Sequence, residues 1–146
     1  MSYYQGKGGI FMMSKIEWNQ NFSIDIEELD EEHKILINIV NQLCDAMRSK
    51  QSKSALPEIL KKLREYIEFH HDHEETYMKN SKYPHFDKHH QDHLEFDATI
   101  QSLSKLHGID LLHAKTLLNT LYDWIINHIC QTDKEFCEFY HQAMKK

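Results

Sequence analysis

The sequence predicts an all-α fold: an up-down-up-down antiparallel four-helix bundle with an N-terminal extended segment before its first helix. Only 4 Gly and 2 Pro interrupt the 146 residues, too few for the frequent turns of an all-β domain. Apolar residues recur instead at steps of three and four, the spacing that marks one face of an α-helix. Four such stretches with short linkers between them predict neighbouring antiparallel helices.

The first helix is expected at about 29–50 and the second at about 56–80, with a polar linker at 49–54. Pro57 is tolerated in a first helical turn. The pair Tyr83-Pro84 ends the second helix, because the residue before a proline avoids helical geometry.

The third helix is expected at about 87–106, and Gly108 is placed to stop it. Asp110 can cap the fourth helix, which continues towards Tyr140. The apolar stripes of the four helices are Leu36, Val40, Leu43 and Met47; Leu60, Leu63 and Ile67; Phe96, Ile100 and Leu103; and Leu118, Leu121 and Ile125.

Composition restricts the class of protein. Residues 1–13 follow no periodic pattern, and we expect a vector leader or disordered N-terminus there, ahead of a bundle domain at 14–146. The formal charge is −6, with 17 basic and 23 acidic side chains, which argues against nucleic-acid binding. No run of 18 apolar residues indicates a transmembrane span. The three cysteines form no close-spaced pair, which is typical of a reducing compartment, so a cytoplasmic location is expected. A monomer is also expected.

Histidine is frequent, at 12 of the 146 residues, and five histidines continue the apolar stripes. Extending each stripe at its own spacing reaches polar side chains on all four helices. In an antiparallel bundle these side chains all lie near the same end. The residues reached are His33 on the first helix, His70 and Glu74 on the second, His89 and His93 on the third, and His128 on the fourth.

These inward-facing polar groups predict a metal site. Burying each without a partner would cost about 1–3 kcal/mol. One such histidine is usually a hydrogen-bonded core residue, but five that converge with a carboxylate indicate metal ligands. A tetrahedral zinc ion needs only four ligands, so two ions account better for the set. A second carboxylate, Asp133, follows His128 by five residues and would point about 140° away on a regular helix, so we expect a local π-type irregularity between them.

In these motifs the chain resembles the hemerythrin family, specifically its single-domain bacterial members. The likeness covers about 16–140, and several motifs occur in order at the right spacings. The motifs are Trp18-Asn19; Asp30-Glu31-Glu32-His33; His70-x-x-x-Glu74-Glu75-x-x-Met78; Tyr83-Pro84 followed by His89-x-x-x-His93-x-x-Phe96; and Trp124-x-x-x-His128-Ile129 with Asp133.

The resemblance implies a non-haem di-iron site that binds O₂ reversibly, for storage, delivery or sensing, rather than an enzyme. It implies that His89, His93 and His128 bind one iron and His33 and His70 the other, while Glu74, Asp133 and an oxo or hydroxo group bridge the two. Two six-coordinate ions offer about twelve positions, of which these ligands fill about eleven. The remaining position falls on the iron with two histidines, where O₂ would bind.

The expected walls of the O₂ pocket are Leu36, His71, Trp124, Ile125 and Ile129. His71 departs from the family, which commonly has phenylalanine after the second-helix histidine. A position one residue from a core ligand lies off the stripe, so His71 is expected beside the bundle or toward solvent. If it faced the pocket instead, it would hydrogen-bond O₂ or speed autoxidation.

Other charged groups are interpreted as surface residues. The acidic run Asp30-Glu31-Glu32 is read as solvated charge at a helix start, where it favours the helix dipole. The histidines outside the stripes, apart from His71, are expected on the surface.

Two further functions stay open at this point. One is a di-iron enzyme that reduces O₂, peroxide or nitric oxide, or repairs iron centres; weak oxidase or peroxidase activity is also compatible with a carrier. The other is storage or sensing of iron without O₂ chemistry. The dense ligand set around one small site disfavours bulk storage, and the apolar wall on the fourth helix favours reversible binding.

Overall fold

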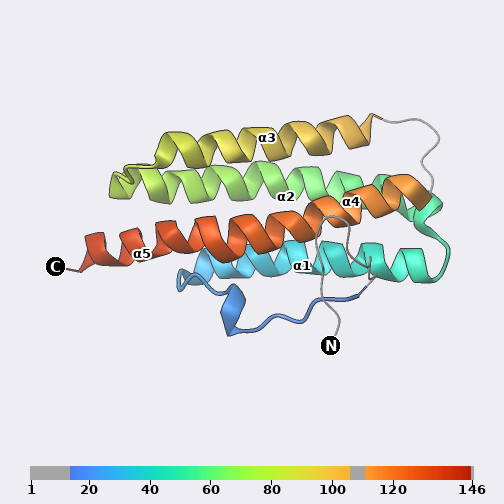
Figure 1. The fold of residues 1–146 in the computed structure, drawn as a ribbon, viewed down its shortest axis with the longest axis horizontal. Helices are drawn as coiled ribbons and strands as arrows, with labels where there is room; N and C mark the ends of the chain where they lie inside the picture. The colour runs from blue at the N-terminus through green and yellow to red at the C-terminus, as the bar shows by residue number, and fades with distance from the viewer. Residues whose placement is uncertain (1–13, 106–110, 146) are drawn as a thin grey trace.

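Four helical arms form an antiparallel bundle in the computed structural model, which describes residues 14–105 and 111–145 (Figure 1). The arms are α1 (Glu27–Arg48), α2 (Ser52–Ser81), α3 (Phe86–Ser104) and a last arm that joins α4 (Leu111–Asp123), the π-helical segment η2 (Trp124–Thr132) and α5 (Asp133–Met144). A short 3₁₀ helix, η1 (Gln20–Phe22), precedes them. Contacts join α1 to α2, α2 to α3, and both α1 and α3 to α4. The predicted all-α four-helix bundle is confirmed.

The start of α2 differs from the expectation. The helix begins at Ser52, so the second half of the expected polar linker at 49–54 is helical, and Pro57 lies inside the helix. A proline so near the start omits only the bond that its own N–H would have made. The helix end agrees with the prediction: Lys82 adopts the left-handed conformation (φ 58°, ψ 46°), directly before Tyr83-Pro84.

The expected stop at Gly108, the expected cap at Asp110 and the expected leader at 1–13 lie outside the described residues. The other described helix ends, those of α1 and the start of α3, fall within about two residues of their predicted positions, which is the ordinary uncertainty of a helix boundary.

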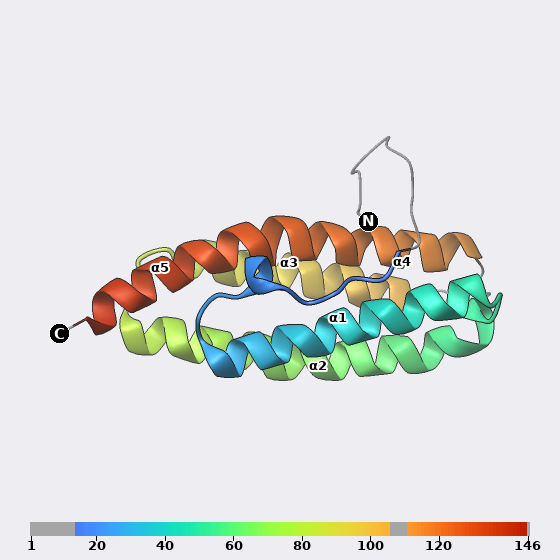
Figure 2. The same cartoon turned by 90° about the horizontal axis from the view of Figure 1, so that it is seen from below.

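The predicted N-terminal extended segment crosses the seam between α1 and the α4 arm (Figure 2). The Asn41 side chain holds it from α1: its Oδ1 accepts from the Ile16 N–H at 2.8 Å, and its Nδ2 donates to the Ile16 carbonyl at 2.9 Å. From the other side of the seam, the Tyr122 hydroxyl donates to the Ser14 carbonyl at 2.5 Å. Hydrogen bonds between the backbone of the segment and side chains of the bundle therefore hold the segment in place.

The apolar core has two parts with polar residues between them. On α1, Leu36 belongs to the larger part and Leu29 to the smaller, and both are fully buried. His33 lies between these two leucines and is also fully buried. On α2, Ile67 and Met78 lie in different parts in the same way. Among the described helices, none is long and apolar enough to cross a membrane.

Candidate metal centre

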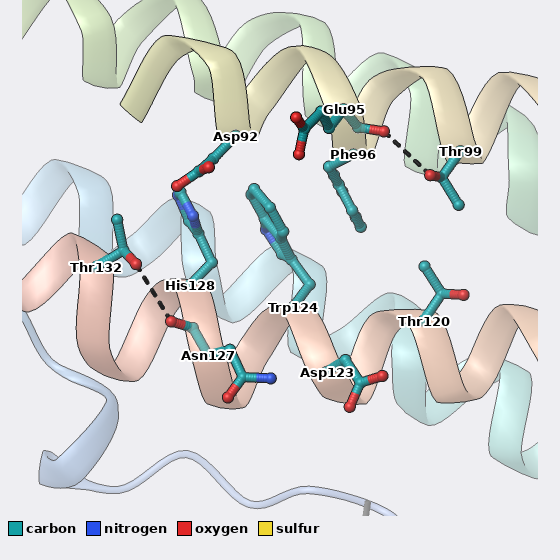
Figure 3. Close-up of a pocket in the computed structure, with 10 residues that line it drawn as sticks. All are labelled: Asp92, Glu95, Phe96, Thr99, Thr120, Asp123, Trp124, Asn127, His128 and Thr132. Atoms are coloured by element: carbon teal, nitrogen blue, oxygen red, sulfur yellow. Dashed lines mark hydrogen bonds between the residues drawn. The ribbon is translucent and has the colours of Figure 1, made fainter. Parts of the chain in front are cut away.

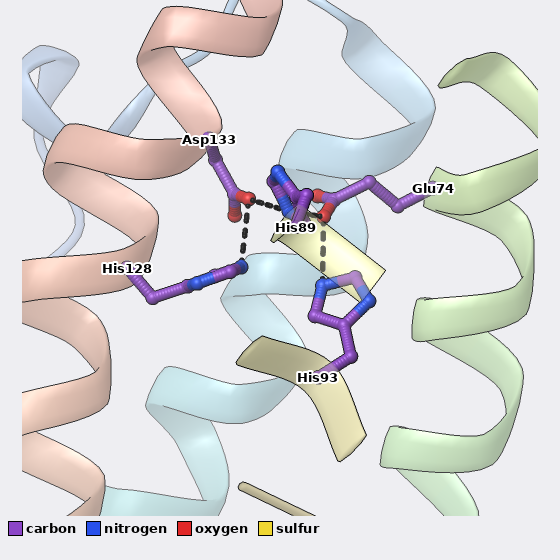
Figure 4. Close-up of side chains that lie close together, drawn as sticks. All are labelled: Glu74, His89, His93, His128 and Asp133. Atoms are coloured by element: carbon purple, nitrogen blue, oxygen red, sulfur yellow. Dashed lines mark hydrogen bonds and ion pairs between the residues drawn. The ribbon is translucent and has the colours of Figure 1, made fainter. Parts of the chain in front are cut away.

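Seven polar side chains from all four arms meet between the two parts of the core, and Figure 4 shows five of them. None is more than 5% exposed. Each is a residue that the sequence singled out as a candidate ligand: His33, His70, Glu74, His89, His93, His128 and Asp133.

One group of side chains gathers around the first oxygen of each carboxylate. Glu74 Oε1 lies 2.8 Å from His89 Nε2 and 3.1 Å from His93 Nε2. Asp133 Oδ1 lies 3.0 Å from both His89 Nε2 and His128 Nε2. Three histidines thus face one oxygen of Glu74 and one of Asp133.

A second group gathers around the other two oxygens. Glu74 Oε2 lies 3.5 Å from His70 Nε2 and 3.8 Å from His33 Nε2. Asp133 Oδ2 lies 3.3 Å from His33 Nε2. Each carboxylate therefore directs one oxygen to each group, and the two groups share Glu74 and Asp133.

The donor atoms fit two small metal ions better than they fit one another. Neighbouring ligands on a six-coordinate ion with bonds of about 2.1 Å are about 3.0 Å apart. The separations in the first group are close to this value, and those in the second group, which reach 3.8 Å, are looser. Asp133 Oδ1 and His128 Nε2 are buried and 3.0 Å apart, yet neither has a partner in hydrogen-bond geometry. His33 Nε2 and His70 Nε2 face each other at 3.1 Å. Atoms arranged in this way converge on a common point, as metal ligands do.

The position of Asp133 depends on η2. Its backbone N–H donates to the carbonyl of His128, five residues earlier, and η2 is π-helical over its whole length. The wide turn absorbs the extra residue and leaves Asp133 fully buried on the side that faces the cluster. The predicted π-type irregularity is confirmed.

Deleting Gln131, an exposed residue of η2, is expected to leave Asp133 in the cluster and the melting temperature undiminished. The deletion places His128 and Asp133 four residues apart, the spacing of a regular α-helix. Deleting Glu135 in the regular helix α5 is the control, because it rotates buried Phe136 by about 100° out of the core and should cost about 3 kcal/mol or more. Thermal unfolding followed by circular dichroism compares the two, and equal losses would contradict the π-helix argument.

Two further carboxylates orient the cluster, and the sequence interpretation missed both roles. Glu32 accepts from His70 Nδ1 at 2.8 Å and from His73 Nδ1 at 2.5 Å. Glu75 accepts from His93 Nδ1 at 2.6 Å and from His90 at 2.8 Å. A carboxylate only accepts, so His70 and His93 each carry a proton on Nδ1 and can present Nε2 to a metal.

Glu32 was interpreted as solvated charge, but it is only 6% exposed. A sequence signal was present, since Glu32 lies three residues after Leu29 and four before Leu36, in phase with the buried stripe. His73 and His90 are partly exposed, which agrees with their expected surface positions.

The carboxylates hold protons on the surrounding histidines when no metal is bound. Burial raises the pKa of Glu74, but contacts with His70, His89 and His93 outweigh it and hold the pKa well below its ordinary value. Burial likewise opposes charge on the histidines. Contacts with Glu32 and Glu74 nevertheless raise the pKa of His70 to about 9, and contacts with Asp133 and Glu74 raise the pKa of His89 to about 10.

Metal binding at pH 7 is therefore expected to release about two protons per chain, from His70 and His89, because a metal displaces protons from its ligands. Both pKa values lie above 7, so the apparent metal affinity should rise as the pH increases toward about 10, the higher of the two values. Potentiometric titration of the metal-free chain in unbuffered solution measures the release. A pH-independent affinity with no proton release would contradict the prediction.

The apolar pocket residues adjoin this cluster. Leu36, Ile125 and Ile129 are at most 2% exposed. The partly exposed Trp124 ring stacks between His128, at 3.8 Å between ring centroids, and Phe96, at 4.0 Å (Figure 3). Trp124 and His128 both line an open groove of about 370 Å³ between α3 and the last arm.

His71 does not lie where the sequence interpretation favoured. It is 5% exposed, and its ring stacks on His93 at 3.8 Å between centroids, nearly parallel. Its Nδ1 lies 3.1 Å from Asp97 Oδ1 on α3, and burial lowers the pKa of His71 to about 4. The expectation of a place beside the bundle or in solvent is wrong, because α2 is covered on more than one side by its neighbours.

Comparison with known proteins agrees with this architecture. A family model described as the hemerythrin HHE cation binding domain matches residues 24–140. The chain belongs to the hemerythrin family. All seven cluster residues lie within the matched hemerythrin domain, whose description as cation binding suits their chemistry.

Individual hemerythrin relatives match most of the chain. Myohemerythrin from Theromyzon tessulatum is 31% identical over 120 residues, which cover 82% of this chain and 89% of that protein. Bacteriohemerythrin from Clostridium acetobutylicum is 26% identical over 127 residues, covering 83% and 98%. Bacteriohemerythrin from Methylococcus capsulatus is 27% identical over 124 residues, covering 84% and 94%.

Proposed function

We propose that this hemerythrin-family chain binds O₂ reversibly at a non-haem di-iron centre. The observation that carries the proposal is the sharing of two carboxylates between two groups of histidines. In this assignment His89, His93 and His128 would hold one iron, His33 and His70 would hold the other, and Glu74 and Asp133 would be shared between them, with an oxo or hydroxo group completing the centre.

Iron(II), when bound, supplies the electrons on which O₂ binding depends. The chain's own residues supply an apolar surround. Leu36, Ile125 and Ile129 are buried in the apolar core, close along their helices to His33 and His128, and in this proposal they exclude water, which limits proton leakage and side reactions. His71 and Trp124 complete the proposed pocket, with their ring centroids 5.7 Å apart.

Charge balance favours the same assignment. Two iron(II) ions carry +4, the two carboxylates −2 and a hydroxide −1, leaving a small net charge. A nearly neutral centre is easier to bury than separate charges. The carboxylates Glu32 and Glu75 add hydrogen bonds that fix the ring orientation of His70 and His93, as supporting partners of metal ligands do.

We further propose a cytoplasmic monomer that stores, delivers or senses O₂. The buried apolar walls support binding over turnover, because release of reduced oxygen needs protons and water at the site. An enzyme that reduces O₂, peroxide or nitric oxide, or repairs iron centres, is the other outcome of the test.

Optical spectroscopy of the iron-loaded, reduced chain tests the proposal. Addition of O₂ is expected to produce a coloured complex that persists and disappears again when O₂ is removed. Rapid conversion to an oxidised state that no longer responds to O₂, with catalytic consumption of peroxide, would indicate the enzyme and contradict reversible binding.

A further inference from the structure

Tyr66 buries a hydroxyl group that has no hydrogen-bond partner. The residue lies one turn before His70 on α2 and is 6% exposed. Its oxygen is buried, and within 14–105 and 111–145 nothing donates to it or accepts from it. Buried polar groups normally find partners, so the phenol needs an explanation.

A second buried tyrosine provides the contrast. Tyr122 is 3% exposed, and its hydroxyl donates to the Ser14 carbonyl, accepts from the Ser14 N–H at 3.2 Å and lies 3.4 Å from Cys44 Sγ. The fold thus satisfies the hydroxyl of Tyr122, which lies away from the cluster, and leaves that of Tyr66 unsatisfied.

The location of Tyr66 relates it to the metal centre. Its ring stacks on the His70 ring, with the centroids 5.2 Å apart and the planes at 12°. His70 belongs to the second group of ligands, with His33, so the phenol lies against that side of the centre. A tyrosine hydroxyl carries its proton at neutral pH, so it is available as a hydrogen-bond donor.

A donor kept in this state destabilises the fold. A buried hydroxyl without a partner loses its bonds to water and gains none in return, and phenylalanine would fill the same space without that loss. We therefore look for the hydrogen-bond partner of the Tyr66 hydroxyl in a ligand that enters the site.

We propose that Tyr66 is a ligand-binding residue whose hydroxyl donates a hydrogen bond to the small ligand bound on the His33 and His70 side of the centre. The inference rests on the proposed function, because it needs a ligand at that position. The ligands selected are small molecules whose outer atom accepts a hydrogen bond, such as O₂ and azide. The bond would lengthen the time that such a ligand stays bound.

The test compares Tyr66→Phe with Tyr122→Phe in the iron-loaded full chain, using azide as the probe of the oxidised centre. Tyr66→Phe is expected to weaken azide binding by about ten-fold or more, the effect of losing a hydrogen bond to a charged partner. Its melting temperature without azide is expected to be unchanged or higher. Tyr122→Phe is expected to show the opposite pattern: a lower melting temperature and unchanged azide affinity.

Infrared spectroscopy provides a signal that changes only if the Tyr66 hydroxyl is hydrogen-bonded to azide, and not if the residue merely stabilises the fold. The azide stretch of the parent chain is expected to shift between H₂O and D₂O, and the shift should disappear in Tyr66→Phe. If Tyr66→Phe binds azide within about two-fold of the parent chain and retains the isotope shift, the proposal is overturned. The hydroxyl would then be the partner of an ordered water molecule. If the parent chain itself binds neither azide nor O₂, the di-iron function fails instead.

Discussion

Replacing Glu74 with alanine is expected to remove both metal ions from the protein, whereas replacing His33 with alanine is expected to remove only one. Glu74 directs one oxygen to each group of histidines, so its loss takes a ligand from both ions. His33 belongs to one group only. Loss of a shared ligand should exceed the roughly 10–100-fold fall in affinity that loss of a supporting partner causes.

Metal analysis by inductively coupled plasma mass spectrometry after dialysis measures this difference in ions per chain. Glu65→Ala is the matched control, because Glu65 is an exposed glutamate on the same helix and should leave the metal content unchanged. Circular dichroism checks that each variant stays helical. Retention of two ions by Glu74→Ala would rule out a bridging role for this carboxylate.

Substitution of Glu32 or Glu75, the carboxylates that accept hydrogen bonds from His70 and His93, is expected to have the second large effect on metal binding. Glu32→Gln and Glu75→Gln are each expected to weaken metal binding by about 10–100-fold. An amide can present its NH₂ group to the imidazole and so lose the preference that keeps the proton on Nδ1. Glu32 supports His70 and Glu75 supports His93, so each substitution should weaken a different one of the two ions.

Competition with a chelator of known affinity measures both losses. Glu31→Gln provides the control on α1, since Glu31 is adjacent to Glu32 but its side chain is 61% exposed and pairs with Lys34. An effect of Glu31→Gln as large as that of Glu32→Gln would show that general charge, rather than the bond to His70, sets the affinity.

Helical phase explains why so much of the site could be predicted from the sequence. Five histidines and Glu74 continue apolar stripes, and a stripe must face the core for its apolar members to be buried. The offset of five residues between His128 and Asp133 predicted η2, because only a wide turn lets both side chains face inward. The arrangement of the four arms followed from short linkers and the scarcity of glycine and proline.

The position of His71 could not be predicted from the apolar stripe of α2 alone. It lies four residues after Ile67 and is therefore as close to the stripe as His70, which lies three residues after it. The buried face of α2 is wide, because α1, α3, α4 and α5 all contact it. The contact of His71 with Asp97 joins two helices, and such pairs depend on how the helices pack, which a single sequence does not state.

The start of α2 was misplaced for a different reason. Proline disrupts helix interiors, so Pro57 was assigned to a first turn. In the structure the helix begins at Ser52, four residues before the expected start at about 56, and the buried Ser52 and Leu56 attach this extra turn to the bundle. Packing there outweighs one missing backbone hydrogen bond.

Anomalous X-ray scattering at the iron edge, from crystals of the iron-loaded chain, distinguishes a bridged di-iron centre from a single-ion site. Two iron peaks are expected in each chain: one bonded to His89, His93 and His128, the other to His33 and His70. Glu74 and Asp133 should each contribute one oxygen to each iron. A single peak, or two irons of which either carboxylate binds only one, would contradict the bridged centre.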